Sequence, residues 1–167
     1  MSTTEEMLRT YPKDLGGIDQ EKLAECIDAC LECAQACTAC ADACLSEDMV
    51  ADLTKCIRTN LDCADLCATT ARILSRHTGY DANLTRAALE ACRTACTSCA
   101  NECEQHTMHE HCTICAEACR RCEQACTALL ETLLHSTTPT TGHARPYRNL
   151  TNKTTAECRA TSNSPSP

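Results

Sequence analysis

Cysteines recur at alternating steps of three and four residues along this chain. In the stretch CIDACLECAQACTACADAC, residues 26–44, six cysteines follow one another at steps of 4, 3, 4, 3 and 4. This spacing places every thiol on one face of an α-helix, at the a and d positions of a heptad repeat. The pattern therefore predicts a long helix whose buried face consists mainly of sulfur.

Three further segments continue the same pattern. Other residues complete their stripes: Met49, Leu53, Asn60, Thr70 and Leu74 in the second, His106 in the third, and Leu129 and Leu133 in the fourth. Eighteen of the nineteen cysteines fall on the four stripes: Cys26, Cys30, Cys33, Cys37, Cys40, Cys44; Cys56, Cys63, Cys67; Cys92, Cys96, Cys99, Cys103; Cys112, Cys115, Cys119, Cys122 and Cys126.

Helix-boundary signals separate the four segments. Gly16 and Gly17 precede the first helix, which Asp19 can cap, and residues 45–48 form a polar turn. Short turns make neighbouring helices antiparallel, so we expect an all-α, up-down-up-down four-helix bundle with a Cys-lined core. A short helix near residues 3–9 is expected to lie across it. The remaining boundary signals are Gly79 as a C′ residue, Asn83 as an N-cap, and Thr107 with Glu110 as a capping box that starts the fourth helix directly after His106.

This topology distinguishes the two ends of the bundle. One end, which we call the mouth, is expected to gather potential soft-metal ligands: Cys44, Met49, His106, Met108, His109 and His111. The opposite end, which we call the closed end, is expected to gather leucines: Leu23, Leu74, Leu84, Leu89, Leu129, Leu130, Leu133 and Leu134.

Composition divides the chain into a segment at 1–18, a bundle at 19–135 and a tail at 136–167. Ser, Thr, Asn, Pro and Gly supply 20 of the last 32 residues, which is typical of disorder. Cys158 lies in this tail, apart from the stripes, and receives no structural role. In the bundle, free cysteine can replace the missing large apolar residues, since Leu, Ile, Val and Phe together number only 22 of 167.

Charge and the N-terminal sequence restrict the location and the partners. The start MSTTEEMLRTYPKDLGG has no apolar core of an export signal, and no window approaches a membrane span, so we expect a cytoplasmic protein with reduced thiols. A net charge of −8 and an aromatic content of 2% argue against nucleic-acid binding.

Thiols at steps of three and four suit a metal ion better than a disulfide. Their Cβ atoms lie roughly 5–6 Å apart, beyond the roughly 3.8 Å that a disulfide prefers. Thiolates select Cu(I), zinc or iron-sulfur clusters, but zinc sites and ferredoxin motifs use turn-borne or differently spaced cysteines. Cu(I) accepts two or three thiolates, and a 1:1 ratio to thiolate is neutral in a dry core. The pattern favours multiple Cu(I) ions per chain, on the order of 15 to 20.

The stretches CIDACLECAQACTACADAC, CRTACTSCANEC and CTICAEACRRCEQAC resemble the cytosolic branch of the bacterial copper storage proteins, over roughly residues 19–135. The resemblance implies copper storage along the bundle core, protection against copper toxicity, a homotetramer, a His- or Met-bearing mouth through which copper enters, and no catalysis. A copper chaperone is then a candidate partner. The tail with Cys158 departs from the family pattern.

Each mouth residue also has an alternative interpretation in which it does not bind metal. His106 lies on the stripe below Cys103, which favours a ligand, but histidine is also common in the last turn of a helix. His109 and His111 are two residues apart and cannot both point fully inward, so they are alternates. Met108 is either a soft ligand or an apolar cap contact.

Two other functions use the same thiols. An iron-sulfur electron carrier would absorb visible light, and a thiol redox sensor would join its helices through disulfides. No set of nucleophile, base and orienting group stands out, so an enzyme is not expected.

Overall fold

The computed structural model of the protein describes residues 1–135 and contains five α-helices. They are α1 (Thr3–Arg9), α2 (Gln20–Leu45), α3 (Thr54–Leu74), α4 (Ala82–Cys103) and α5 (Glu110–His135). Two 3₁₀ turns, η1 (Val50–Leu53) and η2 (Glu104–His106), lie in the connections at the mouth. The predicted tail and Cys158 lie outside the described residues.

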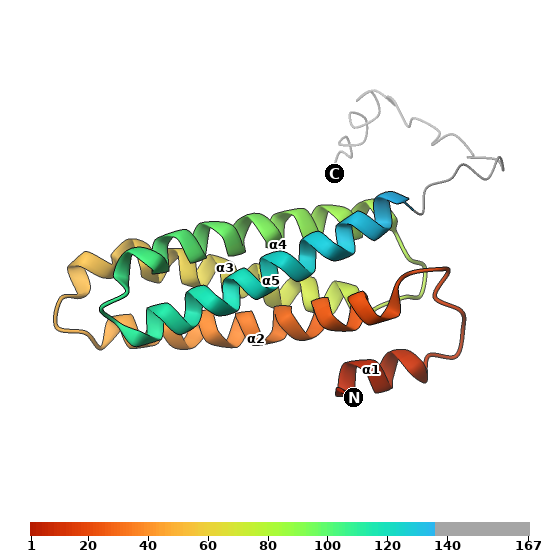
Figure 1. The fold of residues 1–167 in the computed structure, drawn as a ribbon, viewed down its shortest axis with the longest axis horizontal. Coiled ribbons are helices and arrows are strands. Elements are labelled where there is room, and N and C mark those ends of the chain that lie inside the picture. Colours follow the sequence, from red (N-terminus) through yellow and green to blue (C-terminus); the bar gives the residue numbers. More distant parts are fainter. Residues whose placement is uncertain (136–167) are drawn as a thin grey trace, which may run out of the picture.

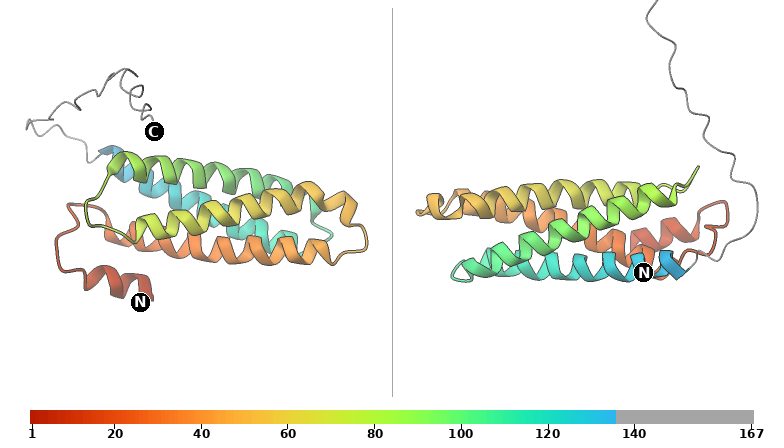
Figure 2. Two further views of the ribbon diagram at one scale, coloured as in Figure 1. Left: turned by 180° about the vertical axis from the view of Figure 1, so that it is seen from behind. Right: turned by 90° about the horizontal axis from the view of Figure 1, so that it is seen from above.

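Helices α2 to α5 form the predicted antiparallel bundle (Figure 1). Each helix packs against two others, because α2 contacts α3 and α5 while α4 contacts the same two helices. The α2–α3 and α4–α5 connections meet at one end of the bundle, and the α3–α4 connection lies at the other (Figure 2). Helix α1 packs along the outside of α2, where the Thr4 hydroxyl donates a hydrogen bond to Asp28.

The helix boundaries agree with those predicted from the sequence at some positions and differ at others. Asp19 caps α2 as predicted, since its carboxylate accepts the Lys22 N–H at 3.1 Å. Helix α4 is capped by Asp81 rather than by Asn83, because α4 starts one residue before Asn83. Gly79, at φ +65°, lies in the connection beyond the end of α3 instead of directly after it.

The predicted capping box before the fourth helix is also wrong in position. Thr107 has φ −65° and ψ −10°, a helical conformation, whereas an N-cap residue is extended. η2 ends at His106 and a turn follows it, so α5 begins at Glu110 instead of immediately after His106.

The core of the bundle is lined by sulfur along most of its length. All eighteen cysteines of residues 1–135 are free, and none is more than 2% exposed. Leu53, Asn60, Thr70 and Leu74 are buried on the α3 stripe as expected. Met49 differs, because its side chain is 63% exposed in the turn before η1.

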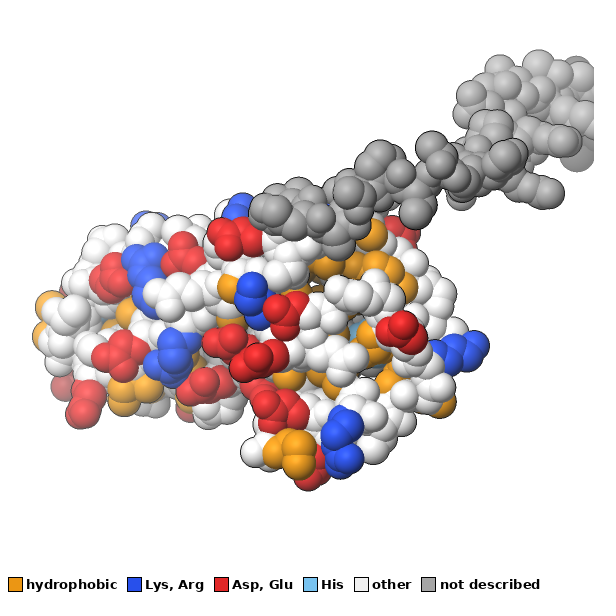
Figure 3. Space-filling view, turned by 45° about the vertical axis from the view of Figure 1, so that its right-hand side comes forward, with side chains coloured by type: hydrophobic (Ala, Val, Ile, Leu, Met, Phe, Trp, Pro, Cys, Tyr) orange, Lys and Arg blue, Asp and Glu red, His pale blue; other side chains and the backbone are white. Residues whose placement is uncertain are grey.

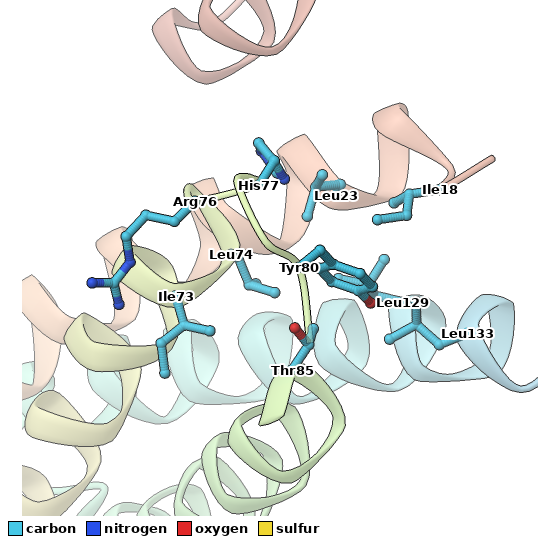
Figure 4. A pocket seen from close by; sticks show the side chains of 10 residues that line it. All are labelled: Ile18, Leu23, Ile73, Leu74, Arg76, His77, Tyr80, Thr85, Leu129 and Leu133. Atoms are coloured by element: carbon cyan, nitrogen blue, oxygen red, sulfur yellow. The ribbon is translucent and has the colours of Figure 1, made fainter. Parts of the chain in front are cut away.

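Leucines fill the closed end, where the thiol array stops. Leu23, Leu74, Leu129 and Leu133 line a small pocket there, together with residues of the α3–α4 connection such as Tyr80 (Figure 4). Leu89 and Leu130 are buried in the same cluster, but Leu84, in the first turn of α4 at this end, is 56% exposed, which corrects its place in the leucine cluster. The closed end is therefore a conventional apolar core, packed by leucine side chains instead of thiols.

The surface around α1 is rich in carboxylates, with basic side chains between them (Figure 3). A groove beside α1 follows the same pattern, since Glu21, Glu25 and Glu32 line it with Arg121. Arg121 donates to Glu32 at 2.7 Å across the groove. None of the helices in residues 1–135 combines the length and apolar character needed to span a membrane.

Candidate metal centre

The inward thiols of the four helices form one continuous array. Sulfur atoms from different helices approach to between 3.5 Å, as for Cys37 and Cys119, and 4.0 Å, as for Cys92 and Cys122. The contacts run along the bundle through Cys26–Cys126 at 3.8 Å, Cys30–Cys122 at 3.6 Å, Cys33–Cys119 at 3.7 Å, Cys37–Cys115 at 3.6 Å and Cys40–Cys112 at 3.8 Å.

Several sets of four ligand atoms lie close enough to share an ion, each set within 4.8 Å. Neighbouring sets overlap, because Cys33 belongs to two of them and so does Cys119. Overlap permits bridging thiolates and a chain of ions. The sets include Cys30, Cys92, Cys122, Cys126; Cys33, Cys37, Cys63, Cys119; Cys33, Cys63, Cys67, Cys96; Cys37, Cys99, Cys115, Cys119; and Cys40, Cys44, His111, Cys112.

Hydrogen bonds among the buried thiols move the pKa values of neighbours in opposite directions. Hydrogen bonds from Cys103 and Cys40 lower the pKa of Cys56 to about 3, whereas the hydrogen bond with Cys115 raises the pKa of Cys103. Burial raises the pKa of Cys44 to about 12. A donating thiol keeps its proton and stabilises the thiolate that accepts from it. Neighbouring thiols of the metal-free array therefore differ in acidity.

Asn60 is a buried amide inside this array, at the position on α3 where the stripe would carry another cysteine. Its Nδ2 donates to the Cys56 carbonyl at 2.9 Å, which fixes the orientation of the amide because a carbonyl only accepts. The opposite atom, Oδ1, accepts hydrogen bonds from the thiols of Cys115 at 2.9 Å and Cys99 at 3.2 Å. Asn60 thus joins α3 to α4 and α5 in the middle of the core.

His111 is the mouth histidine that reaches the array. It lies in the first turn of α5, and its Nδ1 lies 3.4 Å from the Cys40 sulfur and 3.5 Å from the Cys112 sulfur. Its other ring nitrogen, Nε2, lies 3.0 Å from Glu47 Oε1. Burial opposes protonation of His111, but the hydrogen bonds to Cys40 and Glu47 outweigh it and raise the pKa of the imidazole.

His109 packs beside His111, and the two side chains are exposed to a similar extent, 22% and 25%. Its Nδ1 is 2.9 Å from the same Glu47 oxygen, and the two imidazole rings stack with centroids 5.5 Å apart. The hydrogen bond with His111 is the largest cause that lowers the pKa of Glu47, so this carboxylate is ionised at neutral pH. Sequence reasoning missed Glu47, which lies 64 residues from His111 in the chain.

The other two predicted mouth ligands are His106 and Met108. His106 is partly buried, and its Nε2 is 3.3 Å from Glu102 Oε1, one helical turn earlier. Glu102 also pairs with Lys55, whose ammonium is the main cause of its lowered pKa. Met108 is 76% exposed. The four-residue spacing of Glu102, at the end of α4, and His106, in η2, could have indicated their contact from the sequence.

Known proteins with the same arrangement bind copper. A family model described as copper storage protein matches residues 19–131. The structure of the copper storage protein Ccsp from Streptomyces lividans, loaded with 10 copper equivalents, is 68% identical with a TM-score of 0.77, and the match covers 78% of this chain and 99% of that one. The Cu(I)-bound copper storage protein BsCsp3 is 34% identical with a TM-score of 0.57, covering 63% and 94%.

A curated relative shows the same likeness without a known function. The uncharacterized cysteine-rich protein YhjQ of Bacillus subtilis is 35% identical over 104 residues, which are 62% of this chain and 92% of the relative. The fold and the thiol array together define a four-helix bundle with a core suited to soft metal ions. The family match specifies the class further: this chain belongs to the copper storage protein family.

Proposed function

We propose that this protein stores many Cu(I) ions along the core of its bundle and so keeps free copper low. The observation that carries this proposal is the unbroken array of eighteen buried, unpaired thiols between the mouth and the closed end. The copper-loaded relatives from Streptomyces lividans and the Cu(I)-bound BsCsp3 support it.

The sulfur separations support Cu(I) bound by two or three thiolates. With a metal–sulfur bond of about 2.3 Å, by analogy with zinc, two ligands of a trigonal ion lie roughly 4.0 Å apart. The contacts of 3.5 to 4.0 Å are close to this value, so ions fit with small side-chain shifts. A disulfide of about 2.05 Å would require each pair to approach by roughly 1.5 Å or more. The geometry thus favours storage over a redox sensor.

We propose the eighteen cysteines as the storage ligands and the mouth residues as ligands during uptake. His111 is placed best for this role, because its Nδ1 faces Cys40 and Cys112. Met108 is more exposed and would contact copper before it reaches the array, and His109, which stacks on His111, would be the alternate ligand beside it. His106 is held by Glu102, and a metal-bound histidine commonly has such a carboxylate partner.

An anaerobic titration of the reduced protein with Cu(I), followed by competition with a strong Cu(I) chelator, tests storage. We expect saturation on the order of 15 to 20 ions per chain, retained against the chelator, because soft thiolates hold Cu(I) tightly. Saturation at a few weakly bound ions would contradict storage. An iron-sulfur carrier would be the next candidate, and reconstitution with iron and sulfide would test it through its visible absorption.

The mouth role is tested with the variants His111→Ala and His106→Ala. Both should slow Cu(I) uptake more than they lower capacity, since the eighteen thiols remain. Equal loading rates in the variants and the unmodified protein would remove the mouth from the mechanism.

We further propose a cytosolic homotetramer without catalytic activity. The description of the Streptomyces lividans relative as a cytosolic copper storage protein supports the location. The tetramer and a copper chaperone as partner rest on the family resemblance. A monomeric mass by light scattering would refute the tetramer, and catalytic turnover by the copper-loaded protein would refute a pure storage role.

A further inference from the structure

We propose that Glu47 is a positioning residue that holds His111 with its Nδ1 toward the thiol array and thereby sets the rate of copper uptake. This inference rests on the proposed function, because it assigns a role in copper uptake. Glu47 is not itself a ligand in this proposal and acts on copper uptake through the imidazole of His111.

The geometry at Glu47 fixes the ring of His111 from the solvent side. An ionised carboxylate can only accept, so the 3.0 Å contact requires a proton on His111 Nε2. In the neutral ring, the lone pair then lies on Nδ1, which faces Cys40 and Cys112 at 3.4 and 3.5 Å. A histidine that binds a metal through one nitrogen commonly donates the other N–H to a carboxylate, which fixes both tautomer and orientation. Glu47 and His111 have this arrangement.

The same carboxylate oxygen also contacts the imidazole of His109. Glu47 Oε1 lies 2.9 Å from His109 Nδ1, and the two rings are stacked with an interplanar angle of 28°. Glu47 lies in the connection after α2, whereas both histidines lie at the start of α5. The carboxylate therefore links the two connections that meet at the mouth, and its loss would free two rings at once.

The role of Glu47 can be separated from simple attraction between a carboxylate and a cation. Glu47→Gln removes the charge but keeps an oxygen that accepts a hydrogen bond, while Glu47→Leu removes both. Asp48→Asn is the matched control, because it removes one charge from the adjacent, exposed residue. Each variant is loaded anaerobically with Cu(I) in a stopped-flow instrument, and both loading rate and final capacity are recorded.

We expect Glu47→Leu to slow loading by about 10- to 100-fold, the usual effect of losing such a partner. Glu47→Gln should be slowed less, Asp48→Asn should load normally, and all should reach full capacity. The double variant Glu47→Leu/His111→Ala should load no more slowly than His111→Ala alone, since Glu47 acts through His111. Additive slowing in the double variant, or equal rates for Glu47→Gln and Glu47→Leu, would overturn the proposal.

A measurement without copper tests the contact itself. In the reduced, metal-free protein, the ¹H–¹⁵N signal of His111 Nε2 should be observable and slow to exchange, because the proton is held by Glu47. It should persist in Glu47→Gln and disappear in Glu47→Leu. Persistence in Glu47→Leu would refute positioning by Glu47, and failure of the unmodified protein to bind copper would refute the proposed function instead.

Discussion

Replacing Asn60 with alanine should destabilise the metal-free bundle markedly. The amide loses its hydrogen bonds to the Cys56 carbonyl and from Cys115, worth about 1 kcal/mol each. A cavity of roughly 30 Å³ adds about 0.7 kcal/mol at about 24 cal/mol per Å³. Thiols are weak donors, so leaving them unpaired adds little. We therefore expect a loss of about 2 to 3 kcal/mol in the free energy of unfolding, roughly a 100-fold change in the folding equilibrium.

Urea unfolding of the reduced, metal-free protein, followed by circular dichroism, measures this loss. Asn83→Ala is the matched control, because it removes an exposed amide from the first turn of α4 and should change stability little. With copper bound, the difference between Asn60→Ala and the unmodified protein should shrink, since metal–thiolate bonds then join the helices. A loss below about 0.5 kcal/mol in the metal-free protein would show that the amide does not hold the core together.

Two further predictions concern protons. Thiols with raised pKa values, such as Cys44 at about 12, must lose their protons to bind Cu(I). Copper uptake in weak buffer should therefore acidify the solution, and the affinity for Cu(I) should fall from pH 7 to pH 5. A pH-independent affinity would contradict thiolate ligation. Burial lowers the pKa of His77, whose Nε2 has no hydrogen-bond partner, so the folded state binds this proton less well than the unfolded state. The free energy of unfolding should therefore fall as the pH drops from about 6.5 through the pKa of His77 in the folded state. Unfolding free energies at pH 8 and pH 5 measure this loss, and the contribution of His77 should be missing in His77→Gln.

The sequence predicted the bundle and its sulfur core because both follow from the helical period alone. Steps of three and four residues keep the cysteines on one face of a helix, whatever the conformation of the loops. Predictions near helix ends were less accurate. Met49 left the α3 stripe because η1 has about three residues per turn, which changes the rotation of residues before it. Leu84 does not lie on the inward stripe of α4. Counting back from Cys92 by three and then by four residues gives Leu89 and Thr85, which are both buried.

The choice among the mouth histidines depends on contacts between distant segments, which one sequence does not contain. The spacing of His109 and His111 indicated that only one could point fully inward, and the structure places His111 against Cys40. Nothing in the sequence pairs Glu47 with either ring, because the contact exists only when the α2–α3 and α4–α5 connections meet.

The leucine core at the closed end has a consequence for how the protein changes as it fills. Leu23, Leu74, Leu89 and Leu129 pack there without metal, while the remaining core consists largely of small thiols. Amide hydrogen exchange in the metal-free protein should accordingly be slowest near the closed end and fastest toward the mouth. As ions join the four helices, protection should spread along the bundle, so its rigidity would increase with the amount of copper it holds.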